Sequence, residues 1–267
     1  MATNWSELSR EIQDKFSLEG NVKVDIYYDE VGNEKIEDDS TSCPTKYDIN
    51  IISRSLKQTS LFECGKYGAI DTWIYLALTK YSIKDKTVLL LGSADQGYGP
   101  WYESIVVNMG GIPVVTDYNE IIYESLEFKF WSIEKLKNKI SEGFKFDAIL
   151  SISSIEHDGL GRYGDPINPE ADFETMKLLG SYLKKDGLLF LSVPVGSDRL
   201  CYNIHRVYGK HRLPKLLENW IMIDSFGYDK EYLDRNVGSN WWHKTNDGNL
   251  LFNWYPAYEP LFVLKWI

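Results

Sequence analysis

The fold is decided by a short apolar run that leads into a glycine-rich loop and a helix: Thr87-Val88-Leu89-Leu90-Leu91-Gly92-Ser93-Ala94-Asp95-Gln96-Gly97-Tyr98-Gly99-Pro100-Trp101. A continuous apolar run of this length is typical of a strand buried on both faces of a parallel sheet. Glycine permits tight turns and close approach of a ligand to the backbone. Pro100 suits the first turn of a helix, and the glycine pair at 110–111 ends that helix. The stretch therefore predicts a strand, a loop and a helix.

The same alternation continues through the rest of the chain. Counted from the first to the seventh, the strands of the sheet are expected at 87–91, 112–116, 128–131, 147–151, 188–193, 220–223 and 260–267, and a separate strand is expected at 22–28. Helices are expected at 6–16, 70–81, 101–109, 133–140, 173–183 and 213–219. Alternating strands and helices imply a parallel sheet with right-handed crossovers. The last two strands are joined by about 35 residues without a strong helix, so the last strand is expected to return antiparallel. The predicted fold is a Rossmann-like α/β sheet of about seven strands with helices on both faces.

Composition limits the kind of partner. The formal net charge is −10, which disfavours nucleic acid as a ligand because phosphates repel an acidic surface. The chain has no apolar run of the ~20 residues that a membrane span needs. Three scattered cysteines and an N-terminus without a signal-like apolar run lead us to expect a cytoplasmic protein. Its 9 Trp and 18 Tyr fit a carbohydrate or other ring-bearing ligand, or alternatively core packing.

The composition also changes along the chain, near Gly65. Residues 1–60 read as an accessory segment or lid, and residues 61–267 as the main domain.

In an open parallel sheet, ligands bind outside the carboxyl ends of the strands. Asp117 ends the second strand, 24 residues after Ser93, where an acidic residue binds ribose hydroxyls in nucleotide-binding folds. Its alternative role is to cap a turn. The glycines at 92, 97 and 99 do not have the G-x-G-x-x-G spacing of an NAD site. A nucleotide cofactor other than NAD is therefore favoured.

The loop after the fourth strand gathers several chemically active side chains. A neutral His157 can take a proton from a substrate hydroxyl, whereas its alternative role is to pack under the loop. Arg162 and Tyr163 are expected to hold a polar substrate. A divalent ion on Asp158 and Asp165 is a lesser alternative, and the main prediction is that no metal is bound.

A second polar group follows the fifth strand. His205, Arg206 and Tyr208 suit a substrate wall that meets a phosphate or sugar, or alternatively a solvated basic turn.

Five segments together resemble a known family. They are Leu91-Gly92-Ser93 with Pro100-Trp101-Tyr102-Glu103, then Val115-Thr116-Asp117-Tyr118-Asn119, then 154–166, then Asn203 with His205-Arg206-Val207-Tyr208, and finally Glu259-Pro260-Leu261-Phe262-Val263-Leu264. The sequence resembles a little-characterised group, catalogued as a domain of unknown function, within the class I methyltransferase superfamily. Members occur in nematodes, bacteria and giant viruses, some beside or fused to glycan-building enzymes. The resemblance covers the chain from about Gly65 onward.

The resemblance implies a seven-stranded sheet, S-adenosylmethionine as cofactor and a sugar hydroxyl as acceptor. The residues expected to contact the cofactor are Gly92, Ser93, Ala94, Trp101, Asp117, Tyr118 and Ser153. One departure is that Leu90-Leu91 stands where the superfamily usually has an acidic residue before the first glycine.

The leading hypothesis is an O-methyltransferase that acts on a sugar or nucleotide sugar, with His157 as base. It would associate with glycosyltransferases. The alternatives are a non-catalytic nucleotide- or glycan-binding module of the same fold, and a nucleotide-sugar dehydrogenase.

Overall fold

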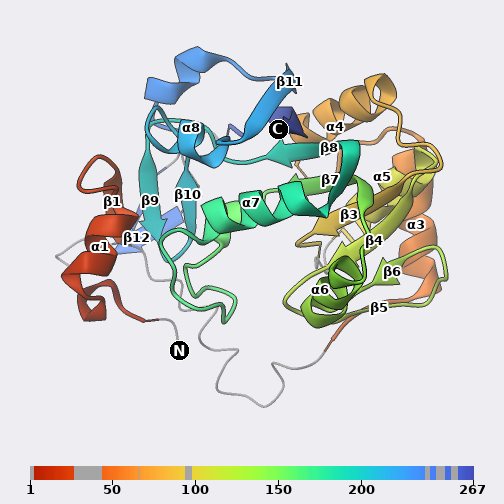
Figure 1. Ribbon diagram of the computed structural model, residues 1–267, viewed down its shortest axis with the longest axis horizontal. Coiled ribbons are helices and arrows are strands. Elements are labelled where there is room, and N and C mark those ends of the chain that lie inside the picture. Colours follow the sequence, from red (N-terminus) through yellow and green to blue (C-terminus); the bar gives the residue numbers. More distant parts are fainter. Residues whose placement is uncertain are drawn as a thin grey trace.

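The computed structural model describes residues 3–26, 44–65, 67–93, 98–237, 241–244, 250–253 and 258–267. Within these residues the largest sheet has seven strands in the order β11-β14-β8-β7-β3-β4-β6 (Figure 1). Its strands are β3 (Thr87–Leu91), β4 (Ile112–Thr116), β6 (Lys129–Phe130), β7 (Phe146–Ile152), β8 (Leu183–Ser192), β11 (Trp220–Phe226) and β14 (Leu261–Trp266). The pairs from β8 to β6 are parallel, whereas β14 is antiparallel to both β8 and β11. This is the predicted Rossmann-like fold of the class I methyltransferase type, with the last strand inserted antiparallel.

Helices cover both faces of this sheet. On one face lie α3 (Ile49–Ser60), α4 (Ala69–Lys80) and α5 (Trp101–Asn108), and on the other α6 (Ile133–Ser141), α7 (Ala171–Tyr182) and α8 (Arg212–Leu216). Strand β3 shows why both faces are covered. Val88 and Leu90 point into the first layer and Leu89 into the second, because side chains alternate along a strand. All three are at most 2% exposed, and each such burial contributes about 1.5–3 kcal/mol.

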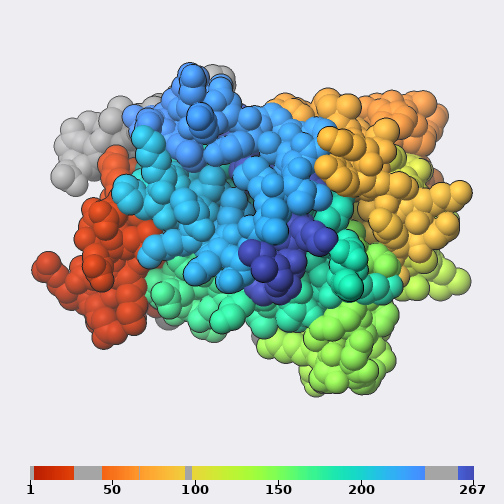
Figure 2. All heavy atoms as spheres, turned by 45° about the horizontal axis from the view of Figure 1, so that its top comes forward, coloured from red at the N-terminus to blue at the C-terminus, as the bar shows by residue number. Residues whose placement is uncertain are grey.

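The N-terminal residues form a separate lobe at one end of the molecule (Figure 2). It contains the short helix η1 (Trp5–Glu7), α1 (Arg10–Phe16) and β1 (Lys23–Ile26). Strand β1 pairs in parallel with β9 (Arg199–Tyr202), and β9 pairs antiparallel with β10 (His205–Val207). Phe16 and Tyr202 are buried together in a small apolar cluster between the lobe and this hairpin. The lobe is thus attached to the main domain through the β9–β10 hairpin.

Residues 45–60 lie elsewhere, against the main domain. Strand β2 (Thr45–Tyr47) pairs with β5 (Ile121–Tyr123), and α3 packs on α5. The Ser55 hydroxyl donates to the carbonyl of Pro100 at 3.2 Å, and the Asn108 amide donates to the carbonyl of Leu56 at 2.8 Å. The second half of the expected accessory segment therefore contributes to the core, and a functional division at residue 60 stays a proposal.

The remaining elements are short. They are the helices η3 (Ile155–His157) and η4 (Lys230–Asp234) and the antiparallel pair β12 (Trp241–Lys244) and β13 (Leu250–Asn253). No helix in the described part of the chain has the length and apolar character needed to cross a membrane.

Most predicted elements are confirmed, and a few differ in extent. Strands β3 and β4 have the predicted bounds. Strand β8 begins earlier, at Leu183, because Asp186 and Gly187 lie within the strand, with Asp186 at φ +64°. Helices α7 and α8 begin earlier than predicted, and α8 also ends earlier.

Candidate functional site

A cavity of about 340 Å³ lies at the carboxyl edge of the sheet, beside the ends of β3, β4 and β7. Its apolar wall comes from the strand end Leu91 and from α6 and α7, through Leu136 and Leu179 among others. Small-molecule sites typically have volumes of about 300–1,000 Å³, apolar walls and a few polar groups. The predicted residues that line the cavity are Gly92, Asp117, Tyr118, Ser153, His157 and Tyr163.

One end of the cavity is built by the residues that follow β4. The Asp117 carboxylate accepts the backbone N–H of Asn119 at 2.9 Å, which holds it at the cavity edge. The hydroxyl of Thr116 is buried in the cavity wall and has no hydrogen-bond partner among the described residues. Burial, with the charges of Asp158, Asp165 and Asp117, raises the pKa of Tyr118 to about 12. This end therefore presents oxygen atoms and negative charge to a ligand.

The glycine-rich loop contributes little side-chain surface. Gly92 has φ +63°, and a Cβ there would lie 2.5 Å from the Ser154 hydroxyl, so the close approach of the two loops requires glycine. Ser93 is buried and does not line the cavity. Ala94 lies outside the described residues. Trp101 is 2% exposed in the core against Gly65, so its predicted contact with a cofactor has no support from this position.

His157 lines the cavity from the loop after β7. Its Nδ1 lies 2.6 Å from the carbonyl of Ile204, and its Nε2 lies 3.7 Å from a carboxyl oxygen of Glu156. Burial, together with the charges of Arg162 and Arg206, lowers the pKa of His157 to about 4, although the bond to Ile204 acts in the opposite direction. The ring is therefore neutral at pH 7. A neutral imidazole is the form that accepts a proton.

Two glutamates lie next to Ser153, which lines the cavity. The Ser153 hydroxyl donates to Glu156 at 2.8 Å and also contacts Glu259. One carboxyl oxygen of each glutamate is buried and lacks a hydrogen-bond partner among the described residues. Burial raises the pKa of both, and the charge of Glu259 raises that of Glu156 further. Sequence reasoning assigned no role to this pair. Glu259 reaches the site only because β14 begins at the carboxyl edge.

The aspartates of the same loop have internal partners. Thr175 donates to Asp158 at 2.7 Å, and burial raises the pKa of Asp158 to about 7. Asp165 accepts the backbone N–H groups of Gly161 and Tyr163, each at 3.2 Å. Within the described ranges no cluster of three His, Cys, Asp or Glu residues is arranged to hold a metal. These carboxyls shape the loop, and the alternative of a divalent ion gains no support.

The predicted substrate residues divide into two groups. Tyr163 lines the cavity, is 50% exposed and packs edge-on against His157. Arg162 lies over the Tyr163 ring, and His205 is buried near His157 with ring centroids 6.3 Å apart, but neither lines the cavity.

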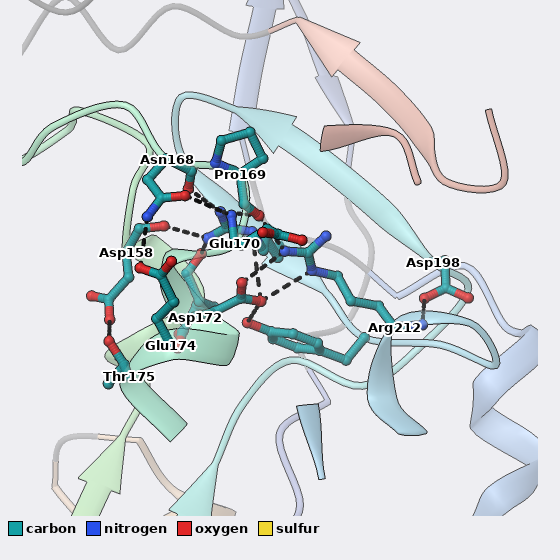
Figure 3. Close-up of polar contacts among 12 residues, drawn as sticks. Asp158, Asn168, Pro169, Glu170, Asp172, Glu174, Thr175, Asp198 and Arg212 are labelled. Carbon is teal, nitrogen blue, oxygen red and sulfur yellow. Dashed lines mark hydrogen bonds and ion pairs between the residues drawn. The ribbon is translucent and has the colours of Figure 1, made fainter. Parts of the chain in front are cut away.

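Arg206 and Tyr208 do not face the cavity. The Tyr208 hydroxyl donates to Asp172 at 3.0 Å, and the Arg206 Nε lies 3.7 Å from the same carboxylate. Arg212 donates to both oxygens of Asp172, and Figure 3 shows these two side chains directed toward each other beside Asn168 and Pro169. All four residues of this network are at most 1% exposed. Direct contact of Arg206 or Tyr208 with a substrate therefore does not fit the structure, because both are used internally.

Sequence reasoning also missed the wall that α7 supplies. Thr175, Leu178, Leu179 and Tyr182 line the cavity, but in the sequence they have the spacing of an ordinary core helix. No signal in one sequence separates such residues from core residues.

The sheet order and the cavity at its carboxyl edge define a protein of the class I methyltransferase fold. The chain belongs to the family described as "Caenorhabditis protein of unknown function, DUF268", whose model matches residues 86–249. No curated protein is significantly similar in sequence to this chain.

Solved structures share the fold only distantly. TehB from Haemophilus influenzae is 13% identical with a TM-score of 0.43, and the match covers 73% of this chain and 61% of TehB. The glycopeptide N-methyltransferase MtfA complexed with sinefungin is 8% identical with a TM-score of 0.41, covering 72% and 92%. An O-methyltransferase family protein from Burkholderia thailandensis is 11% identical with a TM-score of 0.37, covering 81% and 66%. The chain thus spans less than two thirds of TehB, and likenesses this distant assign no activity.

Proposed function

We propose that the protein is an S-adenosylmethionine-dependent O-methyltransferase that acts on a sugar hydroxyl of a glycan or nucleotide sugar. The observation that carries the proposal is the single cavity that combines Asp117, at the end of β4, with a neutral His157, after β7. One end of this cavity suits a nucleoside and the other end suits proton transfer. The two ends lie on opposite sides of β3, the strand that precedes the glycine-rich loop, because β4 and β7 flank β3 in the sheet.

The residues present fit the proposed cofactor. Asp117 would accept hydrogen bonds from ribose hydroxyls. The Thr116 hydroxyl, which lacks a partner among the described residues, would pair with a polar group of the ligand. The apolar wall formed by α6 and α7 would cover the adenine ring of the cofactor. The carboxyls near Tyr118 favour a cation, and S-adenosylmethionine carries a sulfonium and an ammonium group.

His157 is the proposed general base. When bound, S-adenosylmethionine supplies an already activated methyl group, so the protein mainly positions the two reactants. The acceptor hydroxyl needs a proton acceptor as its oxygen forms the new bond to carbon. His157 is neutral and lines the cavity, and general-base help is typically worth about 10²–10⁴-fold.

A sugar acceptor is favoured by the aromatic side chain beside His157. Tyr163 is 50% exposed, packs against the His157 ring and offers a flat apolar face with a polar tip. The carboxyl groups of Asp117 and Asp158 line the same cavity and can accept hydrogen bonds from hydroxyl groups. We also propose that residues 1–60 cover or extend the acceptor side, that glycosyltransferases are partners, and that the protein works in the cytoplasm.

The test is incubation of a panel of glycans and nucleotide sugars with S-adenosylmethionine labelled in its methyl group. We expect label in at least one acceptor, at an oxygen, and about 10²–10⁴-fold slower labelling when His157 is replaced by alanine at the same protein concentration. If no acceptor is labelled while the cofactor still binds, the non-catalytic binding module is the better description. Binding of NAD in place of S-adenosylmethionine would instead favour the dehydrogenase.

A further inference from the structure

The orientation of His157 is set by the β9–β10 hairpin. Ile204, between the two strands, places its carbonyl oxygen 2.6 Å from His157 Nδ1. A carbonyl oxygen only accepts hydrogen bonds, so Nδ1 must carry the proton of the neutral ring. The lone pair then lies on Nε2. The hairpin thus fixes the tautomer in which Nε2 is the nitrogen that accepts a proton.

Arg206, on β10, holds the backbone on both sides of His157. One guanidinium nitrogen, Nη1, lies 3.3 Å from the carbonyl of Glu156 and 2.5 Å from that of Asp158, and donates to both. These are the residues immediately before and after His157. The guanidinium is planar with donors in a rigid fork, which a lysine ammonium does not reproduce. Arg206 therefore restrains the turn that carries the imidazole.

Arg206 is itself anchored behind this turn. Its Nη2 lies 3.5 Å from the carbonyls of Asn168 and Pro169, and its Nε lies 3.7 Å from Asp172. Although burial alone raises the pKa of Asp172, Arg206 and Arg212 hold it below its usual value. The Asp172 carboxylate stays ionised and pairs with both arginines, of which Figure 3 labels Arg212. Arg206 and the backbone carbonyls that it holds, here called the Arg206 clamp, are consequently a buried unit whose charge is paired with Asp172.

The hairpin is supported on its other side by the N-terminal lobe. Strand β1 pairs with β9 along its whole length, and the Tyr202 hydroxyl donates to the carbonyl of Thr3 at 2.8 Å. The lobe, the hairpin and the turn of His157 form one continuous series of contacts.

We propose that Arg206 is a positioning residue: it fixes the turn around His157 so that the Ile204 carbonyl holds the imidazole as the Nδ1–H tautomer, leaving Nε2 to accept a proton. Catalytic use of this arrangement rests on the proposed function, whereas the arrangement itself does not. The role accounts for a fully buried arginine that sequence reasoning placed in the substrate wall.

The test is nitrogen-15 NMR of the histidine rings in the full chain. His157 is identified as the signal lost in His157→Gln. In the unaltered protein we expect Nδ1–H at neutral pH and a pKa of about 4. In Arg206→Lys the ring is expected to populate both tautomers and its pKa to rise, because the turn loosens and admits water. Methyl transfer should fall by up to about a hundred-fold in kcat with little change in the KM for the methyl donor.

The matched control is Arg199→Lys. Arg199 lies on the same hairpin and is also buried, but it pairs with Asp25 and donates to the carbonyl of Val237. Its replacement should leave the His157 signals unchanged. An Nε2–H tautomer in the unaltered chain, or an unchanged His157 spectrum in Arg206→Lys, overturns the proposal. If Arg206→Lys unfolds, Arg206→Gln takes its place, and the same two results, an Nε2–H tautomer in the unaltered chain or an unchanged His157 spectrum in the variant, overturn the proposal. If the unaltered chain has the Nδ1–H tautomer but His157→Ala keeps full activity, the Arg206 clamp is supported and His157 is rejected as the base.

Discussion

Two sets of polar side chains at the carboxyl edge of the sheet differ in exposure and in their binding partners. Asp117, Tyr118 and Tyr163 line the cavity and are partly or largely exposed. Arg206 and Tyr208, on the β10 side, are at most 1% exposed and bind Asp172. Both sets contain residue types that commonly bind ligands. The difference shows that position at the sheet edge is not sufficient for ligand contact, because a buried carboxylate that binds a candidate residue converts it into a structural one.

The comparison separates residues that act on a ligand from residues that hold other residues in place. Substitutions in the first set should change binding or rate while leaving the fold intact. Substitutions in the second set should change stability, or the properties of His157, before they change ligand affinity.

The largest expected effect is on the rate after His157→Ala. Methyl transfer should fall by about 10²–10⁴-fold while affinity for S-adenosylmethionine stays nearly unchanged, because the general base is lost and the nucleoside end is untouched. The measurement is single-turnover transfer of labelled methyl, with His205→Ala as control. His205 is buried near His157 but does not line the cavity. If His205→Ala abolishes transfer and His157→Ala does not, the role of base moves to His205.

The next effect is on stability, after Asp172→Asn. This change leaves two buried arginines without their carboxylate, which costs about 3–5 kcal/mol of unfolding free energy. Urea unfolding measures it. The control is Asp186→Asn, which removes an exposed pair with Lys265 and should leave the transition nearly unchanged. Equal stability of the two variants would show that the Asp172 network is not structural.

A smaller effect is expected on cofactor affinity after Asp117→Ala. Loss of a charge-assisted hydrogen bond of ~1.5–3 kcal/mol weakens binding by roughly ten-fold to a hundred-fold. Glu120→Ala is the matched control, because Glu120 is exposed, equally charged and close in sequence, but does not line the cavity. An affinity that falls equally in both variants would indicate a general charge effect and remove Asp117 from the ribose site.

The smallest expected effect is the contribution of His157 to the pH dependence near neutrality. Only the neutral ring accepts a proton, so its contribution to the rate rises through a pKa of about 4 and is constant from pH 6 to 8. Asp158, in the cavity wall, has its pKa raised by burial to about 7 and changes charge within that range. Asp158→Asn should therefore flatten the pH profile of transfer. A rise centred near pH 6.5 that persists in Asp158→Asn would give His157 an ordinary pKa and contradict its burial.

The parts of the fold that sequence predicted are those with a local signal. The run at 87–91 has the unbroken apolar character of a doubly buried strand, and β3 has those bounds. The antiparallel return of β14 followed from the length of the connection before it. Strand β9 carries no such signal, because its pairing with β1 joins residues about 176 positions apart. Helix α3 was missed because two of its three buried positions are the polar residues Ser55 and Thr59.

The candidate site was predictable to a similar degree. Asp117 and His157 follow strands directly, and their placement at the cavity follows from topology. Glu259 reaches Ser153 because β14, which it precedes, runs antiparallel to β8. Arg206 does not face the cavity because it pairs with Asp172 of α7. Both depend on tertiary contacts between distant segments, which the pattern of one sequence does not encode visibly.

The measurement that tests the central claim most directly is calorimetric titration of the unaltered chain with S-adenosylmethionine, its demethylated product and NAD. The cavity between Asp117 and His157 is proposed to hold the first two, so both should bind saturably at one site, and both should bind more weakly in Asp117→Ala. NAD should give no binding at comparable concentrations, because the loop after β3 lacks the required glycine spacing. Tight binding of NAD, or no binding of S-adenosylmethionine and its product to the folded protein, would contradict the account.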